Sequence, residues 1–219
     1  MNSKSIAFIG SGNMATSLIG GLVADEYDPK QIIASDPDSE KRADLAARFG
    51  ILTAEDNLAA IAQADVVVLA VKPQVLEQIC LSLAQSIQQT QPLVISIAAG
   101  IRESDMQHWL GGNVALVRTM PNTPAMLQAG ATVLHAGKGV SESQRDLAES
   151  ILRAVGLTRW VEDEKLMDIA TALSGSGPTY FFLVMEAMET AAIENGLTPE
   201  TARLLTIQTA LGAARMAIE

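Results

Sequence analysis

The chain has 219 residues, of which 48% are hydrophobic and 18% charged, so it can form a core and is not an intrinsically disordered chain. Its formal net charge is −10 at pH 7 and it has no cluster of Lys or Arg, which argues against binding to nucleic acid. A single cysteine, Cys80, excludes an internal disulfide framework and a cysteine-based zinc site, and no residue spacing indicates another metal site.

Two apolar stretches are too short to target the chain to a membrane. Residues 6–9 near the N-terminus are shorter than the apolar region of a signal peptide. Residues 66–71 form the longest strongly apolar run, and their length is typical of a buried strand and far below a membrane span. We therefore expect a soluble cytoplasmic protein with no membrane partner.

Short β-branched runs alternate with helical stretches from residue 5 to about residue 160. Such alternation predicts an α/β fold in which helices cover both faces of a mostly parallel sheet, as in a Rossmann domain. The run 66–71 has no polar alternation, which is typical of a strand buried on both sides. The predicted strands are 5–10, 31–35, 65–72, 92–98, 114–119 and 131–135.

From about residue 163 the strands stop, and three helices are expected near 163–173, 178–195 and 199–219. Pro178 suits a first helical turn and Gly196 a C-terminal stop, while Thr198 and Pro199 begin the next helix. We therefore divide the chain into a domain 1–162 and a helical domain 163–219. The last helix has no stop signal before Glu219, so we expect the sequence to be a fragment.

Apolar side chains line one face of each of the last two predicted helices. They are either ordinary core residues or a dimer interface, and the spacing alone leaves both interpretations open. In the first helix they are Phe181, Met185, Met188 and Ala192, and in the second Leu204, Ile207, Leu211, Ala214 and Ile218.

The segment Gly10-Ser11-Gly12-Asn13-Met14-Ala15 closes the first predicted strand and opens a helix. This pattern of glycines suits a dinucleotide site: Gly10 permits the tight turn, and Gly12 allows a pyrophosphate close to the backbone. Ala15 is small enough for the helix to pack on the strand, and the helix N-terminus offers free N–H groups to the phosphates. A plain turn without a ligand is the weaker interpretation, because the strand and helix lie where the motif requires them.

The end of the second predicted strand should distinguish NAD from NADP. Asp36 can accept hydrogen bonds from the adenosine ribose, which favours NAD. Ser35 could instead bind a 2′-phosphate, and Lys41 and Arg42 follow one turn away on a helix, where they could equally form a solvated face. The residues lean towards NAD without excluding NADP.

Two later strand ends should reach the same cleft, because ligands bind at the carboxyl ends of parallel strands. Lys72 could contact the phosphates or the nicotinamide ribose, or could be a surface lysine that precedes a helix. The small residues of the second strand end let a ribose or nicotinamide approach the backbone. The two segments are Ala70-Val71-Lys72-Pro73 and Ala98-Ala99-Gly100.

Together with two later motifs, these segments resemble the pyrroline-5-carboxylate reductase family, in the same order along almost the whole chain. The later motifs are far more specific than the glycine pattern. They are Arg118-Thr119-Met120-Pro121-Asn122-Thr123-Pro124-Ala125 and Leu173-Ser174-Gly175-Ser176-Gly177-Pro178-Thr179-Tyr180.

The resemblance implies reduction of the cyclic imine 1-pyrroline-5-carboxylate to L-proline with NADPH or NADH. It also implies a Rossmann domain followed by a helical dimerisation domain, with a homodimer that can assemble into a ring of dimers. By family position, Asn57 should contact the cofactor and Glu164 the substrate. We further expect Pro121 and Asn122, in the loop 118–125, either to shape the pocket near the nicotinamide or to form a rigid connector. Ser174, Gly175 and Ser176 should bind the substrate, form a capped hinge between two helices, or both. Asp36 departs from family members with Arg or Thr there, which puts a strict NADP preference in doubt.

One element of the family is absent from the sequence. A Ser-x-Gly-Gly-x-Thr segment beyond the last helix binds the substrate in these enzymes, and no such segment occurs up to Glu219. We therefore expect the chain to lack the family's C-terminal helices, so that it could bind cofactor and turn over poorly.

A protonated imine is already electrophilic, so the reaction needs placement of two rings more than acid–base groups. We expect His108 to be exposed at a helix end and His135 to be structural, and we assign no catalytic residue. Glu164 could stabilise the cationic imine, or it could be one acid in the solvated run 162–164.

Two alternative functions remain open from the sequence. A relative of the β-hydroxyacid dehydrogenases would need a catalytic lysine in the helical domain, where Lys165 is the only lysine after Lys138 and has no matching motif. A nucleotide-sensing protein without turnover is the other alternative.

Overall fold

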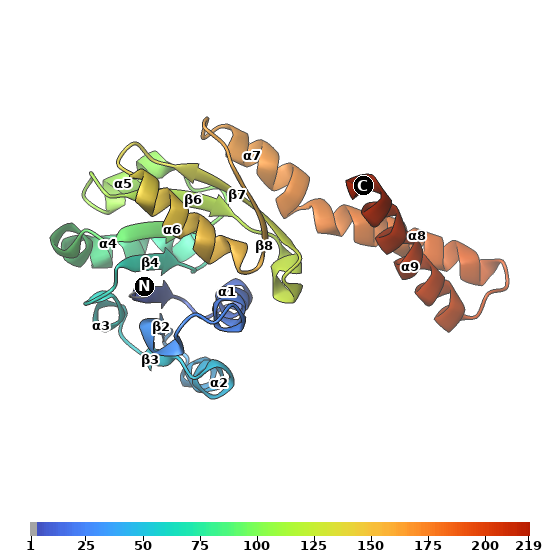
Figure 1. Cartoon of the computed structure of the whole chain (residues 1–219), viewed down its shortest axis with the longest axis horizontal. Helices are drawn as coiled ribbons and strands as arrows, with labels where there is room; N and C mark the ends of the chain where they lie inside the picture. Colours follow the sequence, from blue (N-terminus) through green and yellow to red (C-terminus); the bar gives the residue numbers. More distant parts are fainter. Residues whose placement is uncertain (1–3) are drawn as a thin grey trace. The chain divides into compact units, whose positions relative to one another are not determined.

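The computed structural model describes residues 4–219 and divides into two compact units (Figure 1). The first unit ends at Gly175, and the second comprises Ser176–Glu219.

An eight-stranded sheet forms the centre of the first unit (Figure 1). Its order is β3-β2-β1-β4-β5-β6-β7-β8, in which neighbours from β3 to β6 are parallel and β7 is antiparallel to β6. The order of the six parallel strands is that of a dinucleotide-binding Rossmann sheet, so the predicted fold class is confirmed. The strands are β1 (Ile6–Ile9), β2 (Ile32–Ser35), β3 (Leu52–Ala54), β4 (Val66–Leu69), β5 (Leu93–Ser96), β6 (Leu116–Met120), β7 (Gly130–Ala136) and β8 (Gly156–Trp160).

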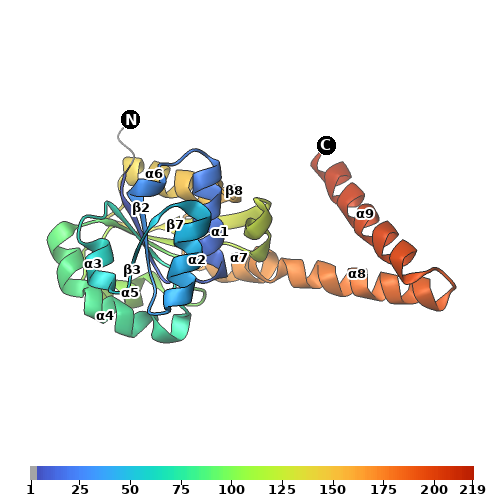
Figure 2. The same cartoon turned by 90° about the horizontal axis from the view of Figure 1, so that it is seen from below.

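Helices cover both faces of this sheet (Figure 2). On one face, α1 (Asn13–Ala24), α2 (Ser39–Phe49) and α6 (Glu142–Arg153) bury apolar side chains against Ile6 and Phe8. On the other face, α3 (Asn57–Ile61), α4 (Pro73–Thr90) and α5 (Glu103–Trp109) pack around Ala7 and Ile9. Burial of β1 on both faces explains its apolar run without alternation. Short helical turns complete the unit: η1 (Pro29–Gln31), η2 (Thr123–Leu127), α7 (Leu166–Ala170) and the π-helical η3 (Thr171–Gly175).

Two strands of the sheet were not predicted, and both are sheet edges. Strand β3 has only three residues, and Leu52 at its start is 46% exposed, so it lacks the apolar signal of a buried strand. Strand β8 includes a buried Thr158 between exposed Leu157 and Arg159, the reverse of the usual apolar-in pattern. The predicted strand 65–72 ends at Leu69, because Pro73 already begins α4.

The thiol of Cys80 is fully buried on α4, and burial raises its pKa to about 12. Because the thiolate is the reactive form, we expect the folded chain to resist a disulfide reagent at pH 8 and the urea-unfolded chain to react at its single cysteine. Absorbance of the released thiol measures both rates. Rapid stoichiometric reaction of the folded chain would contradict the burial of this residue.

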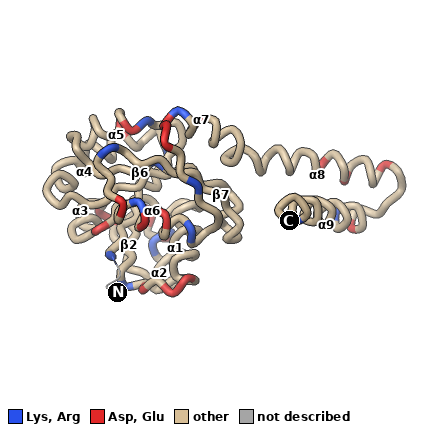
Figure 3. The backbone as a smooth tube through the Cα atoms, turned by 45° about the horizontal axis from the view of Figure 1, so that its top comes forward, with Lys and Arg blue, Asp and Glu red and all other residues tan. Residues whose placement is uncertain are grey.

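The second unit consists of α8 (Gly177–Glu194) and α9 (Pro199–Ile218). Few charged residues lie along these helices (Figure 3), and many large apolar side chains are exposed. Phe181 is 67% exposed, Leu204 62% and Ile218 85%, so the interpretation of these faces as core of the single chain is wrong. No helix within residues 4–219 is long and apolar enough to cross a membrane.

Candidate dinucleotide and substrate site

The turn after β1 requires glycine at Gly10. Its φ of +97° is in the region that L side chains rarely adopt, and a Cβ there would lie 2.7 Å from the carbonyl oxygen of Ala70. The Gly10 N–H donates to the carbonyl of Ser35 over 2.8 Å. The turn is therefore wedged between the ends of β2 and β4, where a dinucleotide would cross the sheet.

Gly12 is the N-cap of α1 and provides no side chain to cap its first turn. A Cβ on Gly12 would have no atom within 4 Å, so the space above the backbone is open. Ala15 is buried against the sheet. An uncapped helix N-terminus beside open space can bind a pyrophosphate, so these residues suit a dinucleotide. A cleft of about 580 Å³ adjoins the turn, lined by Ser11, Gly12, Asn13, Thr16, Glu40, Lys41, Asp44, Leu45 and Arg48.

Asp36 follows β2 and binds the glycine turn directly. Its Oδ2 accepts the Ser11 N–H over 3.0 Å and the Ser11 hydroxyl over 2.7 Å, while Oδ1 accepts the N–H of Asp38 over 3.0 Å. Burial opposes ionisation, but these hydrogen bonds and the nearby Lys41 outweigh it and hold the pKa of Asp36 below its usual value. The carboxylate thus orders the glycine turn.

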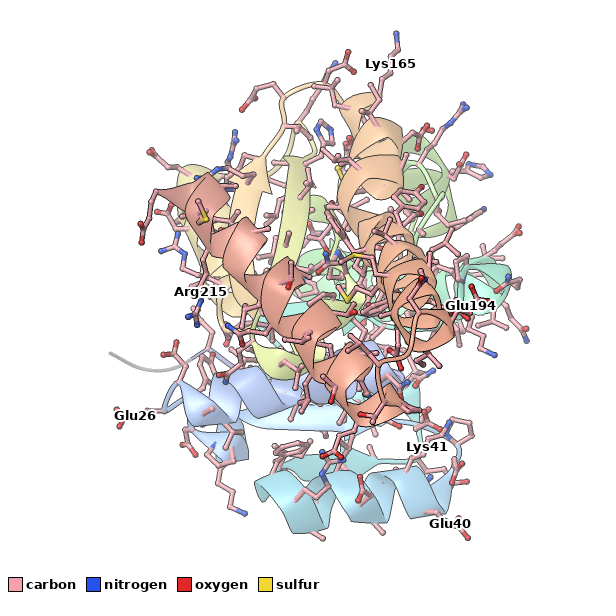
Figure 4. All side chains as sticks on the ribbon, turned by 90° about the vertical axis from the view of Figure 1, so that its right-hand side faces the viewer. Glu26, Glu40, Lys41, Lys165, Glu194 and Arg215 are labelled. Atoms are coloured by element: carbon pink, nitrogen blue, oxygen red, sulfur yellow. The ribbon has the colours of Figure 1, made fainter. Side chains whose placement is uncertain are left out.

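The neighbours of Asp36 are also engaged within the protein. The Ser35 hydroxyl donates to Oδ1 of Asn57 over 2.7 Å, so the structure brings these two predicted cofactor residues together. Arg42 donates to the carbonyls of Asp36 and Pro37 over 2.6 and 3.0 Å, which makes it a support of the loop. Lys41 is exposed and points outward from α2 (Figure 4), so it is the more accessible of the two cations.

Because the pKa of Asp36 is lowered on folding, its ionised form stabilises the fold above the unfolded value of about 3.9, and this contribution is lost as pH falls through the folded value. We expect the Asn variant, Asp36→Asn, to be less stable than the natural chain at pH 7 and to lose less stability on acidification. Urea unfolding between pH 7 and pH 3 measures both slopes. Asp25→Asn, at an exposed position, serves as control and should keep the natural slope; an unchanged slope for Asp36→Asn would contradict the role of its hydrogen bonds.

The later strand ends lie at the same edge of the sheet as the glycine turn. Lys72 is exposed and is the N-cap of α4, with Pro73 at the first helical position, while Ala70 and Val71 lie against Gly10. After β5, Ala98 is buried, Ala99 and Gly100 are exposed, and Gly100 has a φ of +75°. Pro121 and Asn122, beyond β6, are buried.

Glu164 forms an ion pair with the buried guanidinium of Arg118 on β6. The same carboxylate oxygen, Oε1, accepts the N–H of Glu103 at the start of α5 over 2.6 Å. Burial disfavours the ionised form, but these contacts, with smaller help from His135, outweigh it and hold the pKa of Glu164 below its usual value. Glu164 is therefore not a freely solvated acid, and it ties together β6, α5 and the segment before α7.

The serine–glycine turn follows a π-helical turn. The Ser174 hydroxyl donates to the carbonyl of Ala170 over 2.9 Å, and its own carbonyl accepts the side-chain N–H of Asn122 over 2.9 Å. Ser176 is the N-cap of α8, with no side-chain capping bond. An inserted π turn is frequent at functional sites, because it redirects backbone groups at one point of a helix.

Sequence reasoning missed the partners that hold these residues. Arg118 and Glu103 around Glu164, and Arg42 beneath Asp36, act through contacts between distant segments that leave no local pattern. His108 is exposed at the end of α5, as expected, while Nδ1 of the buried His135 lies 3.2 Å from the carbonyl of Val161. Among residues 4–219, no group of His, Cys, Asp and Glu is arranged to hold a metal ion.

Two family profiles match different parts of the chain. One, described as NADP oxidoreductase coenzyme F420-dependent, matches residues 5–100. The other, described as pyrroline-5-carboxylate reductase dimerisation, matches residues 164–219.

Similar proteins cover the whole chain. A pyrroline-5-carboxylate reductase from Pseudomonas aeruginosa is 52% identical over 100% of this chain and 80% of its own length, and one from Arabidopsis thaliana is 36% identical over 98% and 77%. The solved reductase from Coxiella burnetii superposes with a TM-score of 0.95 at 48% identity, over 99% of this chain and 80% of that one. The pyrroline carboxylate reductase of Plasmodium falciparum, solved with NADP bound, gives 0.89 at 26% identity, over 100% and 80%.

The Rossmann sheet, the open glycine turn and the matching profile define an NAD(P)-dependent oxidoreductase. Within that class, relatives 52% and 47% identical over the full chain share one name. The chain belongs to the pyrroline-5-carboxylate reductase family, as its motifs indicated.

Proposed function

We propose that this chain reduces 1-pyrroline-5-carboxylate to proline with NADPH or NADH. The observation that carries the proposal is the match, at 52% identity over the full chain, to a protein named pyrroline-5-carboxylate reductase. The open glycine turn at the carboxyl edge of the sheet supports it independently, since a hydride donor must bind there.

The proposed cofactor site follows the carboxyl edge of the sheet. The glycine turn would hold the pyrophosphate, the end of β2 the adenosine ribose, and the ends of β4, β5 and β6 the nicotinamide half. The residues we assign to it are Gly10, Ser11, Gly12, Asn13, Met14, Ala15, Ser35, Asp36, Asn57, Ala70, Val71, Lys72, Pro73, Ala98, Ala99, Gly100 and Pro121.

For the substrate we propose the serine–glycine turn, with Ser174, Gly175 and Ser176, and the carboxylate of Glu164. Both hydrogen bonds of Glu164 to the described residues use Oε1, so Oε2 is the oxygen that would face a cationic imine. The lowered pKa keeps this group ionised at neutral pH, which suits stabilisation of a positive charge.

When bound, the reduced nicotinamide supplies a hydride. The protein's part is to bind the imine in its protonated, electrophilic form, to orient its ring and to exclude water. The carboxylate of Glu164 would favour the protonated imine.

We also propose how the chain is divided into domains, how it associates and where it is located. We propose the division into domains 1–162 and 163–219, a homodimer, a ring of such dimers and a cytoplasmic location. The exposed apolar faces of α8 and α9 support self-association, because isolated chains rarely leave such faces uncovered.

The charge of Asp36 should set the preference between the two cofactors. Removing it in Asp36→Ala eliminates a ribose acceptor and relieves repulsion of a 2′-phosphate, so we expect affinity for NADH to fall relative to NADPH by about tenfold. Fluorescence titration of both cofactors measures the ratio. Ser11→Ala, which loosens the turn and keeps the charge, should weaken both equally; an unchanged ratio in Asp36→Ala would refute the assignment.

A direct assay tests the function. The natural chain is mixed with NADPH or NADH and with pyrroline-5-carboxylate, and oxidation is followed by the absorbance of the reduced nicotinamide. We expect oxidation that depends on the imine and yields proline. Cofactor binding without imine-dependent oxidation would favour a nucleotide-sensing protein instead.

A β-hydroxyacid dehydrogenase would oxidise 3-hydroxy acids with NAD⁺ or NADP⁺, and the same assay in that direction tests it. The structure gives it little support, because Lys165 is exposed and points away from the ribbon (Figure 4).

A further inference from the structure

The carboxyl end of β6 contacts the segment 164–175 at both of its ends. Arg118 forms the ion pair with Glu164, where the segment begins. Two residues later, Met120 lies against Gly175: a Cβ on Gly175 would be 2.6 Å from Met120 Cε. Two residues further, Asn122 donates to the carbonyl of Ser174. Alternate residues of one extended segment therefore hold the segment 164–175 at its two ends.

The segment between the two attachment points is also held along its length. Both α7 and η3 pack on β7. A segment fixed at both ends and packed between them leaves the serine–glycine turn little freedom to move.

Asn122 is the attachment nearest to the turn, and its side-chain nitrogen and oxygen each make a hydrogen bond. Its side-chain N–H₂ donates to the Ser174 carbonyl over 2.9 Å, and its Oδ1 accepts the N–H of Ala131 over 2.9 Å. The two partners determine the positions of the side-chain oxygen and nitrogen of Asn122, because a carbonyl only accepts a hydrogen bond and an N–H only donates one. The residue is 8% exposed. Both polar atoms of the Asn122 side chain are therefore used within the protein, one on each side of the loop.

We infer that Asn122 is a positioning residue, which sets the serine–glycine turn against the carboxyl end of β6. The inference rests on the proposed function in one respect: the turn it positions is the proposed substrate site. Since a displacement of about 1 Å at a reacting pair has a large effect on rate, loss of this bond should impair use of the imine far more than binding of NADPH.

The test is Asn122→Asp, which keeps the side-chain shape and the acceptor for Ala131 but replaces the donor to Ser174 by an acceptor. We expect kcat/KM for pyrroline-5-carboxylate to fall about tenfold, while the dissociation constant of NADPH changes by less than about twofold. We also expect faster amide hydrogen exchange in peptides covering residues 164–176, a readout that needs no turnover. Asn195→Asp is the matched control, because Asn195 makes the same kind of bond to the carbonyl of Ala191 within α8, and should change none of the three.

A second variant covers the case in which Asn122→Asp does not fold. Asn122→Ala removes both side-chain hydrogen bonds without adding a charge, and we expect the same fall in kcat/KM and the same faster exchange. Weakening of NADPH binding in step with kcat/KM, or unchanged exchange at 164–176, would overturn the inference. A natural chain that binds NADPH without oxidising it with the imine would contradict the proposed function, and hydrogen exchange would then decide the positioning role alone.

Discussion

Replacing Glu164 by alanine is expected to lower the free energy of unfolding by about 3 kcal/mol. The guanidinium of Arg118, whose side chain is 7% exposed, would lose its carboxylate and remain buried as an uncompensated charge. The N–H of Glu103 would lose its acceptor as well. Glu164→Gln should cost less, since an amide oxygen can still accept both hydrogen bonds. Urea unfolding at pH 7, followed by tryptophan fluorescence, measures each difference.

The same acidic run offers a matched control. Glu162 pairs with Arg145 over 3.1 Å, but its side chain is 84% exposed, so this pair is screened by water. Glu162→Ala should therefore leave the unfolding midpoint almost unchanged. If Glu162→Ala and Glu164→Ala were equally destabilising, burial of Arg118 would not explain the effect, and the tie between β6 and the segment before α7 would lose its energetic basis.

Gly10→Ala is expected to be the most damaging change in the proposed cofactor site. A methyl group there would overlap the carbonyl of Ala70 and force an L residue to keep a φ of +97°. We expect a loss of stability of about 3 kcal/mol or more, together with loss of NADPH binding, because the turn cannot move without separating β1 from β4. Thermal unfolding and a fluorescence titration with NADPH measure the two effects.

Gly12→Ala should separate binding from folding. Its φ is −71° and its Cβ would meet nothing within 4 Å, so stability without cofactor should change by less than about 0.5 kcal/mol. The added methyl group would stand where we propose that the pyrophosphate approaches the backbone, and we expect NADPH affinity to fall about tenfold. Undiminished NADPH binding by this variant would refute the placement of the phosphates at the turn.

The strands that were predicted correctly are those with a strong local signal. Val66–Leu69 is apolar at every position because helices cover both faces of the sheet there. At the sheet edge, β8 pairs with β7, and its exposed Leu157 and Arg159 alternate with a buried hydroxyl. Local composition cannot predict such a strand, since pairing with a neighbour distant in sequence is what makes it a strand.

In the candidate site, too, features with a local sequence pattern could be predicted and contacts between distant residues could not. The positions of Gly10 and Gly12 follow from a fixed spacing between strand and helix, which the sequence displays. The bonds from Ser11 to Asp36 and from Asn122 to Ser174 join residues 25 and 52 positions apart. Such contacts depend on the packed arrangement of several elements, so their residues could be named from the sequence while their partners could not.

The central position of β1 in the sheet has a consequence for how the chain folds. Ile6 pairs with Ile32 on one side and with Val66 on the other, so one edge of this apolar strand stays open until residues some sixty positions later have been synthesised and docked. Pairing over such distances slows folding and leaves an edge open to other chains in the meantime. The pairing of β1, the strand that ends in the glycine turn, is therefore completed late. A nascent chain released before β4 would expose an unpaired strand edge that can associate with other chains.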